Sequence, residues 1–121
     1  MPFKVKHCWT FEGLEKEELI ERLNHKTDAN FILIDTIGKY EGNNVRIKGA
    51  TTIRYLEAID RREELRKYDE IIIYCRGRSC PLSEKVAVGL KLFDIPNVMV
   101  YKGGIEEWAA SGLPLEEIED K

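Results

Sequence analysis

The chain has 121 residues, a formal net charge of −3, and positive and negative side chains interspersed along its length. This length suits one domain spanning residues 1–121, and the charge pattern argues against a nucleic-acid or membrane-surface protein. No apolar stretch approaches the roughly 18 residues that a membrane helix needs, and the N-terminus has no signal-peptide core, so we expect a cytoplasmic protein. Three cysteines, an odd number, favour free thiols over a disulfide framework.

Short apolar runs alternate with helical patterns along the chain. The predicted elements are a strand at 5–9, a helix at 14–23, a buried strand at 31–34, a turn-rich segment at 38–44, a turn into a short strand at 49–53, a helix at 57–67, a strand at 71–75, a helix at 82–93 that Pro96 terminates, a strand at 98–101 and a helix from 103 that Gly112 stops. Strands alternating with helices indicate parallel strands joined by crossovers. We therefore predict an α/β fold, with a mainly parallel central sheet of about five strands and helices on both faces.

The most informative segment begins at Cys75, where a predicted strand ends. Ligands in such folds bind outside the carboxyl ends of the strands. Arg76 and Arg78 follow, and then come Cys80, Pro81 and the next helix. A cationic loop and a helix N-terminus lower the pKa of a thiol, and the thiolate is the reactive form. We predict that Cys75 is a nucleophile for an anionic sulfur or oxyanion substrate; the alternative is a small buried hydrophobic residue.

Four separated motifs occur in an order that carries a family resemblance. They are Ile34-Asp35 followed by Ile47-Lys48-Gly49-Ala50; Tyr74-Cys75-Arg76; Ser83-x-Lys85-x-Ala87-x-x-Leu90; and Val100-Tyr101-x-Gly103-Gly104-Ile105-x-x-Trp108 closing with Gly112-Leu113-Pro114. In this order they resemble the single-domain rhodanese-like sulfurtransferases over nearly the entire chain. Two positions differ from the family pattern: Ile37 stands where the family commonly has an arginine, two residues after the aspartate, and Arg46 stands where it commonly has a histidine. The loop after Cys75 is longer than the family's common loop, and the extra length brings in Cys80 and Pro81.

The resemblance implies a rhodanese-like fold and a sulfur-transfer reaction. The Cys75 thiolate would attack the outer sulfur of thiosulfate or a polysulfide, and a thiol or cyanide would then take the sulfur from the resulting persulfide. The implied substrate-binding loop comprises Arg76, Gly77, Arg78, Ser79, Pro81, Leu82 and Ser83. Asp35 and Arg46 are expected at the mouth of the site. Their alternatives are a local turn-forming residue for Asp35 and a solvated surface charge for Arg46.

Cys80 has three open interpretations. It is a resolving thiol that forms a disulfide with Cys75, a primary nucleophile placed at a helix N-cap by Pro81, or a small packing residue. A zinc site that adds His7 and Cys8 is disfavoured, because the four residues between Cys75 and Cys80 exceed the usual two-residue spacing of zinc ligands. We expect no metal and no cofactor.

Three functions follow from these observations. The leading one is a sulfurtransferase with a small anionic sulfur donor and a thiol, cyanide or persulfide-bearing protein as acceptor. The second is a persulfide carrier or interaction module without turnover. The third, an arsenate reductase or phosphatase-like enzyme, is disfavoured because such enzymes close the loop with an arginine where this chain has Pro81. No nucleic-acid or membrane partner is expected, and the sequence leaves the oligomeric state open.

Overall fold

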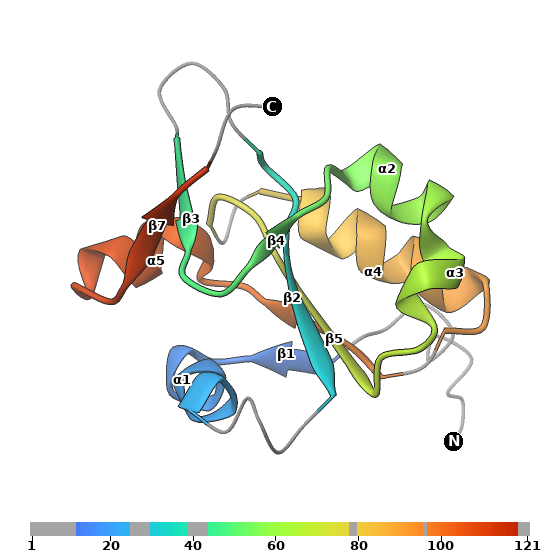
Figure 1. Ribbon diagram of the computed structural model, residues 1–121, viewed down its shortest axis with the longest axis horizontal. Helices are drawn as coiled ribbons and strands as arrows, with labels where there is room; N and C mark the ends of the chain where they lie inside the picture. The colour runs from blue at the N-terminus through green and yellow to red at the C-terminus, as the bar shows by residue number, and fades with distance from the viewer. Residues whose placement is uncertain (1–11, 25–29, 39–43, 78–79, 96, 119–121) are drawn as a thin grey trace, which may run out of the picture.

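The computed structural model describes residues 12–24, 30–38, 44–77, 80–95 and 97–118. In chain order its elements are β1 (Glu12–Leu14), α1 (Lys16–Asn24), β2 (Phe31–Asp35), β3 (Val45–Ile47), β4 (Thr51–Thr52), α2 (Tyr55–Asp60), α3 (Arg62–Leu65), β5 (Glu70–Tyr74), α4 (Leu82–Leu92), β6 (Val98–Tyr101), α5 (Gly104–Ala110) and β7 (Leu115–Glu117) (Figure 1). The strand predicted at 5–9 lies outside the described residues. None of the described helices is long and apolar enough to span a membrane.

Five strands form one parallel sheet in the order β1-β6-β5-β2-β4. Strands β3 and β7 form a separate antiparallel pair. Helices α1 and α5 pack on one face of the main sheet, and α2, α3 and α4 pack on the other (Figure 1). The predicted α/β fold is therefore confirmed. β5 lies at the centre of the sheet, so the residues that follow it emerge in the middle of the sheet's carboxyl edge.

The burial of β5 decides which way the next residue points. Ile71, Ile72 and Ile73 are all completely buried. Ile72 and Tyr74 belong to the core beneath α1 and α5, whereas Ile71 and Ile73 belong to the core beneath α2, α3 and α4. Successive side chains of a strand alternate between faces. The side chain of Cys75 therefore follows Ile73 and points toward α4.

Several elements differ from those predicted. The helix predicted at 57–67 is two helices, α2 and α3, which meet at Arg61 with φ −101° and ψ 21°. Helix α4 ends at Leu92, and Asp94 adopts a left-handed φ of 63°, so the chain leaves the helix before Pro96. Strands β1, β3 and β7 were not predicted, because strands of three residues show too little alternation to be recognised.

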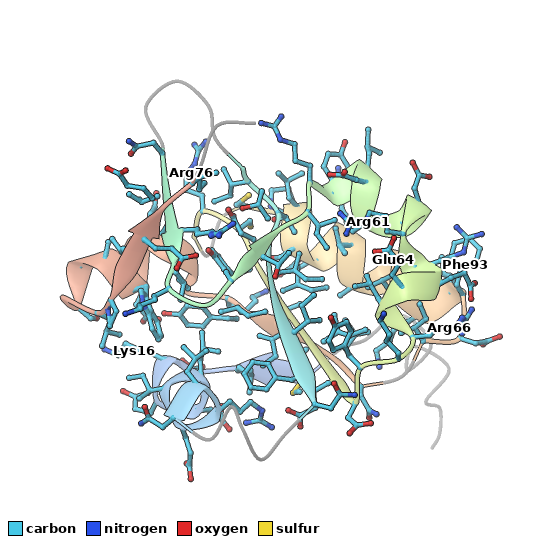
Figure 2. The ribbon with its side chains drawn as sticks, viewed as in Figure 1. Lys16, Arg61, Glu64, Arg66, Arg76 and Phe93 are labelled. Carbon is cyan, nitrogen blue, oxygen red and sulfur yellow. The ribbon has the colours of Figure 1, made fainter. Side chains whose placement is uncertain are left out.

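The carboxyl end of α4 is fastened to α3. The Arg62 guanidinium lies 3.9 Å from the centroid of the Phe93 ring, and Arg66 donates a hydrogen bond of 2.8 Å to the Phe93 carbonyl. Figure 2 shows Arg66 and Phe93 on the opposite side of the molecule from Arg76. Helix α4 is thus anchored far from the loop that follows Cys75, and its first turn faces that loop.

Candidate functional site

We call residues 75–81 the thiol loop. Cys75 is the first residue after β5 and is only 1% exposed. Its thiol donates a hydrogen bond to the Cys80 carbonyl oxygen at 3.2 Å and lies 3.4 Å from the Ser83 hydroxyl. Ser83 is in the first turn of α4, and its backbone N–H also reaches the Cys75 sulfur. The strand end, the loop and the helix therefore converge on one sulfur atom.

Cys80 lies beside Cys75 and is half-buried. Its sulfur accepts hydrogen bonds from the Cys75 thiol and from the backbone N–H groups of Leu82 and Arg76. Pro81 occupies the N-cap position of α4, with φ −88° and ψ −2°, so the placement of Cys80 at the N-cap is wrong by one residue. The sulfur of Cys80 nevertheless receives the first N–H group of the helix.

The two thiols differ in acidity. Burial raises the pKa of the Cys75 thiol, and the hydrogen bond with Cys80 raises it further, while the contacts with Ser83 oppose this shift. Burial also acts to raise the pKa of Cys80. Hydrogen bonds from the Cys75 thiol and from the N–H groups of Leu82 and Arg76, with the positive charge of Arg76, outweigh burial and lower that pKa. The expectation that the loop lowers the pKa of Cys75 is therefore wrong, because its donors stabilise the neighbouring sulfur.

This arrangement makes the thiols a single titrating pair. When one sulfur ionises, the other thiol donates to it, so the first proton lost belongs to the pair. Because the pKa of Cys80 is lowered and that of Cys75 is raised, Cys80 ionises first and Cys75 keeps the remaining proton. Once the pair has ionised, the buried thiol lies in hydrogen-bond contact with a thiolate.

The first turn of α5 fixes the backbone of the thiol loop. The N–H of Ile105 donates to the Cys75 carbonyl at 3.1 Å, and the N–H of Glu106 donates to the Arg76 carbonyl at 2.9 Å. Gly104 permits this approach, because it has φ +65° and a Cβ there would lie 2.5 Å from the Cys75 carbonyl oxygen. In a trans peptide the N–H points away from the C=O. Holding the Cys75 carbonyl therefore directs the N–H of Arg76 toward the thiols.

The rest of the predicted loop is only partly described. Arg78 and Ser79 lie outside the described residues. Gly77 is buried against the carboxylate of Glu106, where an added Cβ would meet a carboxylate oxygen at 2.5 Å. The described part of the loop therefore contacts α5 in two places. The Glu106 carboxylate packs against Gly77, and backbone N–H groups of α5 donate to the two loop carbonyls.

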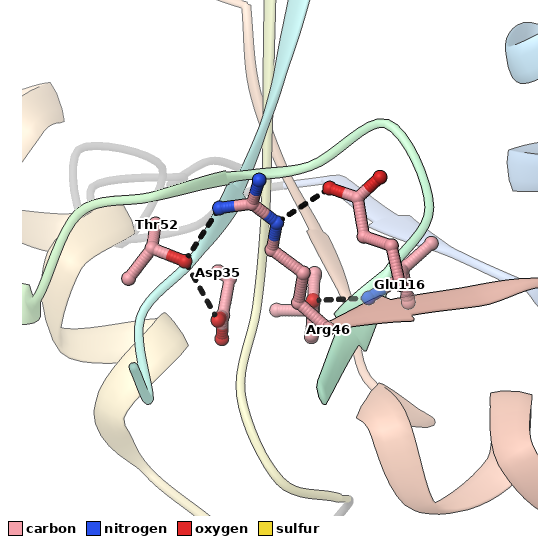
Figure 3. Close-up of polar contacts among 6 residues, drawn as sticks. Asp35, Arg46, Thr52 and Glu116 are labelled. Carbon is pink, nitrogen blue, oxygen red and sulfur yellow. Dashed lines mark hydrogen bonds and ion pairs between the residues drawn. The ribbon is translucent and has the colours of Figure 1, made fainter. Parts of the chain in front are cut away.

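Asp35 and Arg46 belong to a second polar group, which we call the β2 cluster together with Thr52 and Glu116 (Figure 3). The Thr52 hydroxyl donates to Asp35 Oδ2 at 3.2 Å and accepts from Arg46 Nη1 at 3.0 Å. Arg46 Nε donates to Glu116 Oε2 at 2.6 Å. Asp35 Oδ1 accepts the N–H of Ile37 at 3.0 Å, as expected of a turn-forming residue. Arg46 is ion-paired, so the alternative of a solvated surface charge is wrong.

The β2 cluster and the thiols lie on opposite faces of the sheet. Asp35 is paired with Tyr74 between β2 and β5, and Tyr74 belongs to the core beneath α1 and α5. Residues paired across neighbouring strands point to the same face, so Asp35 points away from α4 while Cys75 points toward it. Among the described residues, no hydrogen bond joins the β2 cluster to Cys75 or Cys80. The assignment of Asp35 and Arg46 to the mouth of the site stays a prediction.

Sequence reasoning missed Thr52 and Glu116. Arg46 and Glu116 are directly opposite each other in the β3–β7 pair, so only that pairing reveals the contact. A hollow of about 360 Å³ adjoins the cluster; it is lined by Leu23, Lys48, Gly49, Trp108, Pro114 and Glu116. The thiol loop contributes none of these lining residues.

Over the described part of the chain, no group of three or more His, Cys, Asp and Glu side chains is placed to hold a metal ion. Cys75 and Cys80 are both free thiols. His7 and Cys8, which the disfavoured zinc site would have used, lie outside the described residues.

Comparisons with known proteins agree with this geometry. The family model described as a rhodanese-like domain matches residues 15–111, which include β5, the thiol loop and α5. No curated protein matches the chain.

Solved structures share the fold at low sequence identity. They include the rhodanese-like domain of an Anabaena protein, at 23% identity and a TM-score of 0.73 over 90% of this chain and 81% of that one. A rhodanese-related protein from Thermoplasma volcanium is 18% identical, with a TM-score of 0.70 over 88% and 98% of the two chains. A protein of unknown function from Rhodopseudomonas palustris, described as a possible tyrosine phosphatase, is 16% identical, with a TM-score of 0.74 over 96% and 99%. These likenesses establish the fold, and the family match covers most of the sequence. The chain therefore belongs to the rhodanese-like domain family.

Proposed function

We propose that this protein is a sulfurtransferase that carries sulfane sulfur as a persulfide on Cys75. The observation that carries the proposal is the buried Cys75 thiol, held at a strand end by the first turn of α4 and hydrogen-bonded to a second, more acidic thiol. A thiol becomes a strong nucleophile when an adjacent base takes its proton. In our proposal Cys80 is that base once it has ionised, because it is the more acidic thiol and lies in contact with Cys75.

The donor is thiosulfate or a polysulfide. The Cys75 thiolate attacks the outer sulfur of thiosulfate, the sulfur–sulfur bond of the donor breaks, and sulfite leaves with the electron pair. Cys75 keeps the outer sulfur as a persulfide. A thiol, which can belong to a protein, or cyanide then attacks this outer sulfur and leaves as a new persulfide or as thiocyanate, which restores Cys75. The positive charge of Arg76 favours an anionic donor at the loop.

The test is the intact mass of reduced protein after a brief incubation with thiosulfate or, separately, with polysulfide. At the shortest times, before any later reaction of the persulfide, we expect wild type and a Cys8→Ser control to gain the mass of one or more sulfur atoms, and Cys75→Ser to gain none. Circular dichroism checks that each variant is folded. Thiosulfate-to-cyanide transfer at the wild-type rate by Cys75→Ser contradicts the proposal. Loss of uptake in Cys80→Ser alone moves the persulfide to Cys80.

A persulfide carrier without turnover is the second candidate, because the buried thiol suits storage as well as transfer. Steady-state kinetics with thiosulfate and cyanide separate the two functions. A carrier accepts sulfur once per chain and then stops, whereas a transferase turns over repeatedly.

Oxyanion chemistry is the third candidate, supported by the likeness to the Rhodopseudomonas palustris protein described as a possible tyrosine phosphatase. Pro81 opposes it, because the sixth residue after Cys75 then has neither a charge nor an N–H to bind an oxyanion. Hydrolysis of a phosphate ester or reduction of arsenate that depends on Cys75 would favour this candidate.

A further inference from the structure

We propose that Cys80 attacks the Cys75 persulfide, so that the domain releases its sulfur as hydrosulfide and closes a Cys75–Cys80 disulfide that an external dithiol must reduce. This inference rests on the persulfide of the proposed function. It adds a reaction for the second thiol and a dithiol as the class of co-substrate.

The contact between the thiols carries the inference. The Cys75 thiol donates to the Cys80 carbonyl at 3.2 Å, so the two cysteines are in direct contact, and their interaction raises the pKa of Cys75 and lowers that of Cys80. In a persulfide, the inner sulfur is the Cys75 Sγ itself. The second thiol is thus positioned beside the atom that it must attack, and such positioning replaces an encounter with an external thiol.

Accessibility favours the internal thiol over external ones. Cys75 is 1% exposed, whereas Cys80 is half-buried at the outer side of the pair. An external thiol must pass into the loop to reach a persulfide on Cys75. Cys80 is already part of the loop, so its thiol does not have to enter from solvent, and its half-buried side chain presents its own sulfur to an incoming reductant.

Acidity also supports the exchange. Thiol–disulfide exchange requires an attacking thiolate, and the N–H groups of Leu82 and Arg76 stabilise the thiolate of Cys80. The backbone N–H of Ser83 reaches the Cys75 sulfur, next to the bond that breaks when hydrosulfide departs. Backbone N–H groups thus stabilise negative charge on Cys80 before the attack and beside the departing sulfur during release.

The reaction balances as an internal redox step. The Cys80 thiolate attacks the inner sulfur of the Cys75 persulfide, a bond forms between the two cysteine sulfurs, and the bond to the outer sulfur breaks. The outer sulfur leaves with the electron pair as hydrosulfide and retains its proton. The two cysteine sulfurs are oxidised and the sulfane sulfur is reduced. A dithiol then reduces the protein disulfide by two successive exchanges and becomes a cyclic disulfide.

The test is a single turnover of the full chain without reductant. Fully reduced protein is desalted, mixed with substoichiometric polysulfide or thiosulfate, and examined for intact mass and for hydrosulfide trapped by monobromobimane. We expect wild type and Cys8→Ser to lose the mass of two hydrogens and to release hydrosulfide in proportion to the disulfide formed. Cys80→Ser should instead keep the added sulfur and release none. Peptide mapping should place the disulfide between Cys75 and Cys80.

The outcomes separate this inference from the proposed function. Wild type that keeps a stable persulfide, with no disulfide and no hydrosulfide, overturns the inference and leaves the sulfurtransferase intact. Wild type that shows neither added sulfur at any time nor a disulfide with released hydrosulfide, from either donor, overturns both. Hydrosulfide release at the wild-type rate from Cys80→Ser also overturns the inference.

A second measurement does not depend on a sulfur donor. Wild type and Cys8→Ser are equilibrated in redox buffers of reduced and oxidised dithiothreitol and quenched with a thiol-blocking reagent. Their intact masses are then measured by mass spectrometry. We expect a reversible two-electron transition that is absent in Cys75→Ser and in Cys80→Ser. Failure to form the Cys75–Cys80 disulfide in any of these buffers means that the folded loop forbids the bond, which overturns the inference.

Steady-state turnover shows whether the reductant must be a dithiol. With thiosulfate as donor, dithiothreitol should support faster hydrosulfide production than 2-mercaptoethanol at equal thiol concentration, because a dithiol completes the second exchange within one molecule. Cys80→Ser should lose this preference. An equal rate with both reductants in wild type contradicts the dithiol requirement.

Discussion

The thiol loop and the β2 cluster follow the carboxyl ends of two neighbouring strands, β5 and β2, yet they use polar groups in opposite ways. In the β2 cluster, Thr52 joins a carboxylate to a guanidinium, and Glu116 neutralises the far side of that guanidinium. In the thiol loop, the two neighbouring groups are both thiols, and their interaction raises the pKa of one and lowers the pKa of the other.

This difference distinguishes a polar cluster that holds structure from a pair of groups that is suited to chemistry. Donors paired with acceptors, and positive charges paired with negative ones, keep side chains in one arrangement. No buried side-chain nitrogen or oxygen of the described residues lacks a hydrogen-bond partner. A pair of like groups, both titratable, cannot satisfy itself in this way, so its protonation state stays available for chemistry. We therefore expect the β2 cluster to contribute stability and the thiol loop to carry the proposed reactivity.

The largest expected effect comes from breaking the contact between α5 and the thiol loop. Gly104→Ala should lower the free energy of unfolding by about 3 kcal/mol, because a side chain at positive φ is strained and its Cβ collides with backbone that cannot move aside. Urea denaturation measures the change. Gly112→Ala is the matched control, since Gly112 has φ +75° but nothing within 4 Å of an added Cβ, and it should cost about 1 kcal/mol. An equal loss of unfolding free energy in the two variants would mean that the close contact between α5 and the thiol loop adds nothing to stability.

The next effect sharpens the difference between the two sulfurs. Because the pKa of Cys80 is lowered and that of Cys75 is raised, Cys80 reaches its thiolate form at lower pH. Iodoacetamide should alkylate Cys80 at least about tenfold faster than Cys75 at neutral pH, which corresponds to about 1.4 kcal/mol. Peptide mapping over a pH series measures both rates. In Cys80→Ser, Cys75 loses a contact that raises its pKa, so its alkylation curve should move to lower pH. A wild-type Cys75 that reacts at lower pH than Cys80 contradicts the assignment.

A smaller effect is expected from opening the β2 cluster. Thr52→Val removes the hydroxyl between Asp35 and Arg46 and should cost about 1–2 kcal/mol of stability, while sulfur uptake by Cys75 stays unchanged. Thr51→Val, at the exposed neighbouring position, is the control and should cost little. If Thr52→Val slows sulfur uptake strongly while the protein remains folded, the cluster belongs to the site after all.

The sequence predicted the fold better than the chemistry of the site. Continuous apolar runs such as Ile71–Ile73 identified the buried strands, because full burial on both faces leaves a local pattern. The motif around Cys75 predicted a reactive strand end, and the reactivity stays a prediction. The sequence could not show which sulfur receives the N–H groups of Arg76 and Leu82. That depends on the path of the loop and on the hydrogen bonds that α5 donates to the loop backbone. Likewise, the partnership of Arg46 with Glu116 depends on two strands far apart in the chain.

The smallest effect concerns the protonation of the β2 cluster. Burial raises the pKa of Asp35 above 3.8, although hydrogen bonds from Ile37 and Thr52 oppose this. The folded state therefore retains the Asp35 proton to higher pH than the unfolded state does. The contribution of this carboxyl to stability is fully present below pH 3.8 and falls as the pH rises through the folded pKa.

Asp35→Asn removes this titration. The difference in unfolding free energy between wild type and Asp35→Asn should shift in favour of the variant by about 1 kcal/mol or less as the pH rises through that window. Urea denaturation over a pH series measures the difference. Adding Thr52→Val removes a contact that lowers the pKa of Asp35, so the window should extend to higher pH in that background. A shift in favour of wild type with rising pH would mean that the attraction between Asp35 and Arg46 outweighs burial, and the cluster would then be an ionic site and not a buried brace.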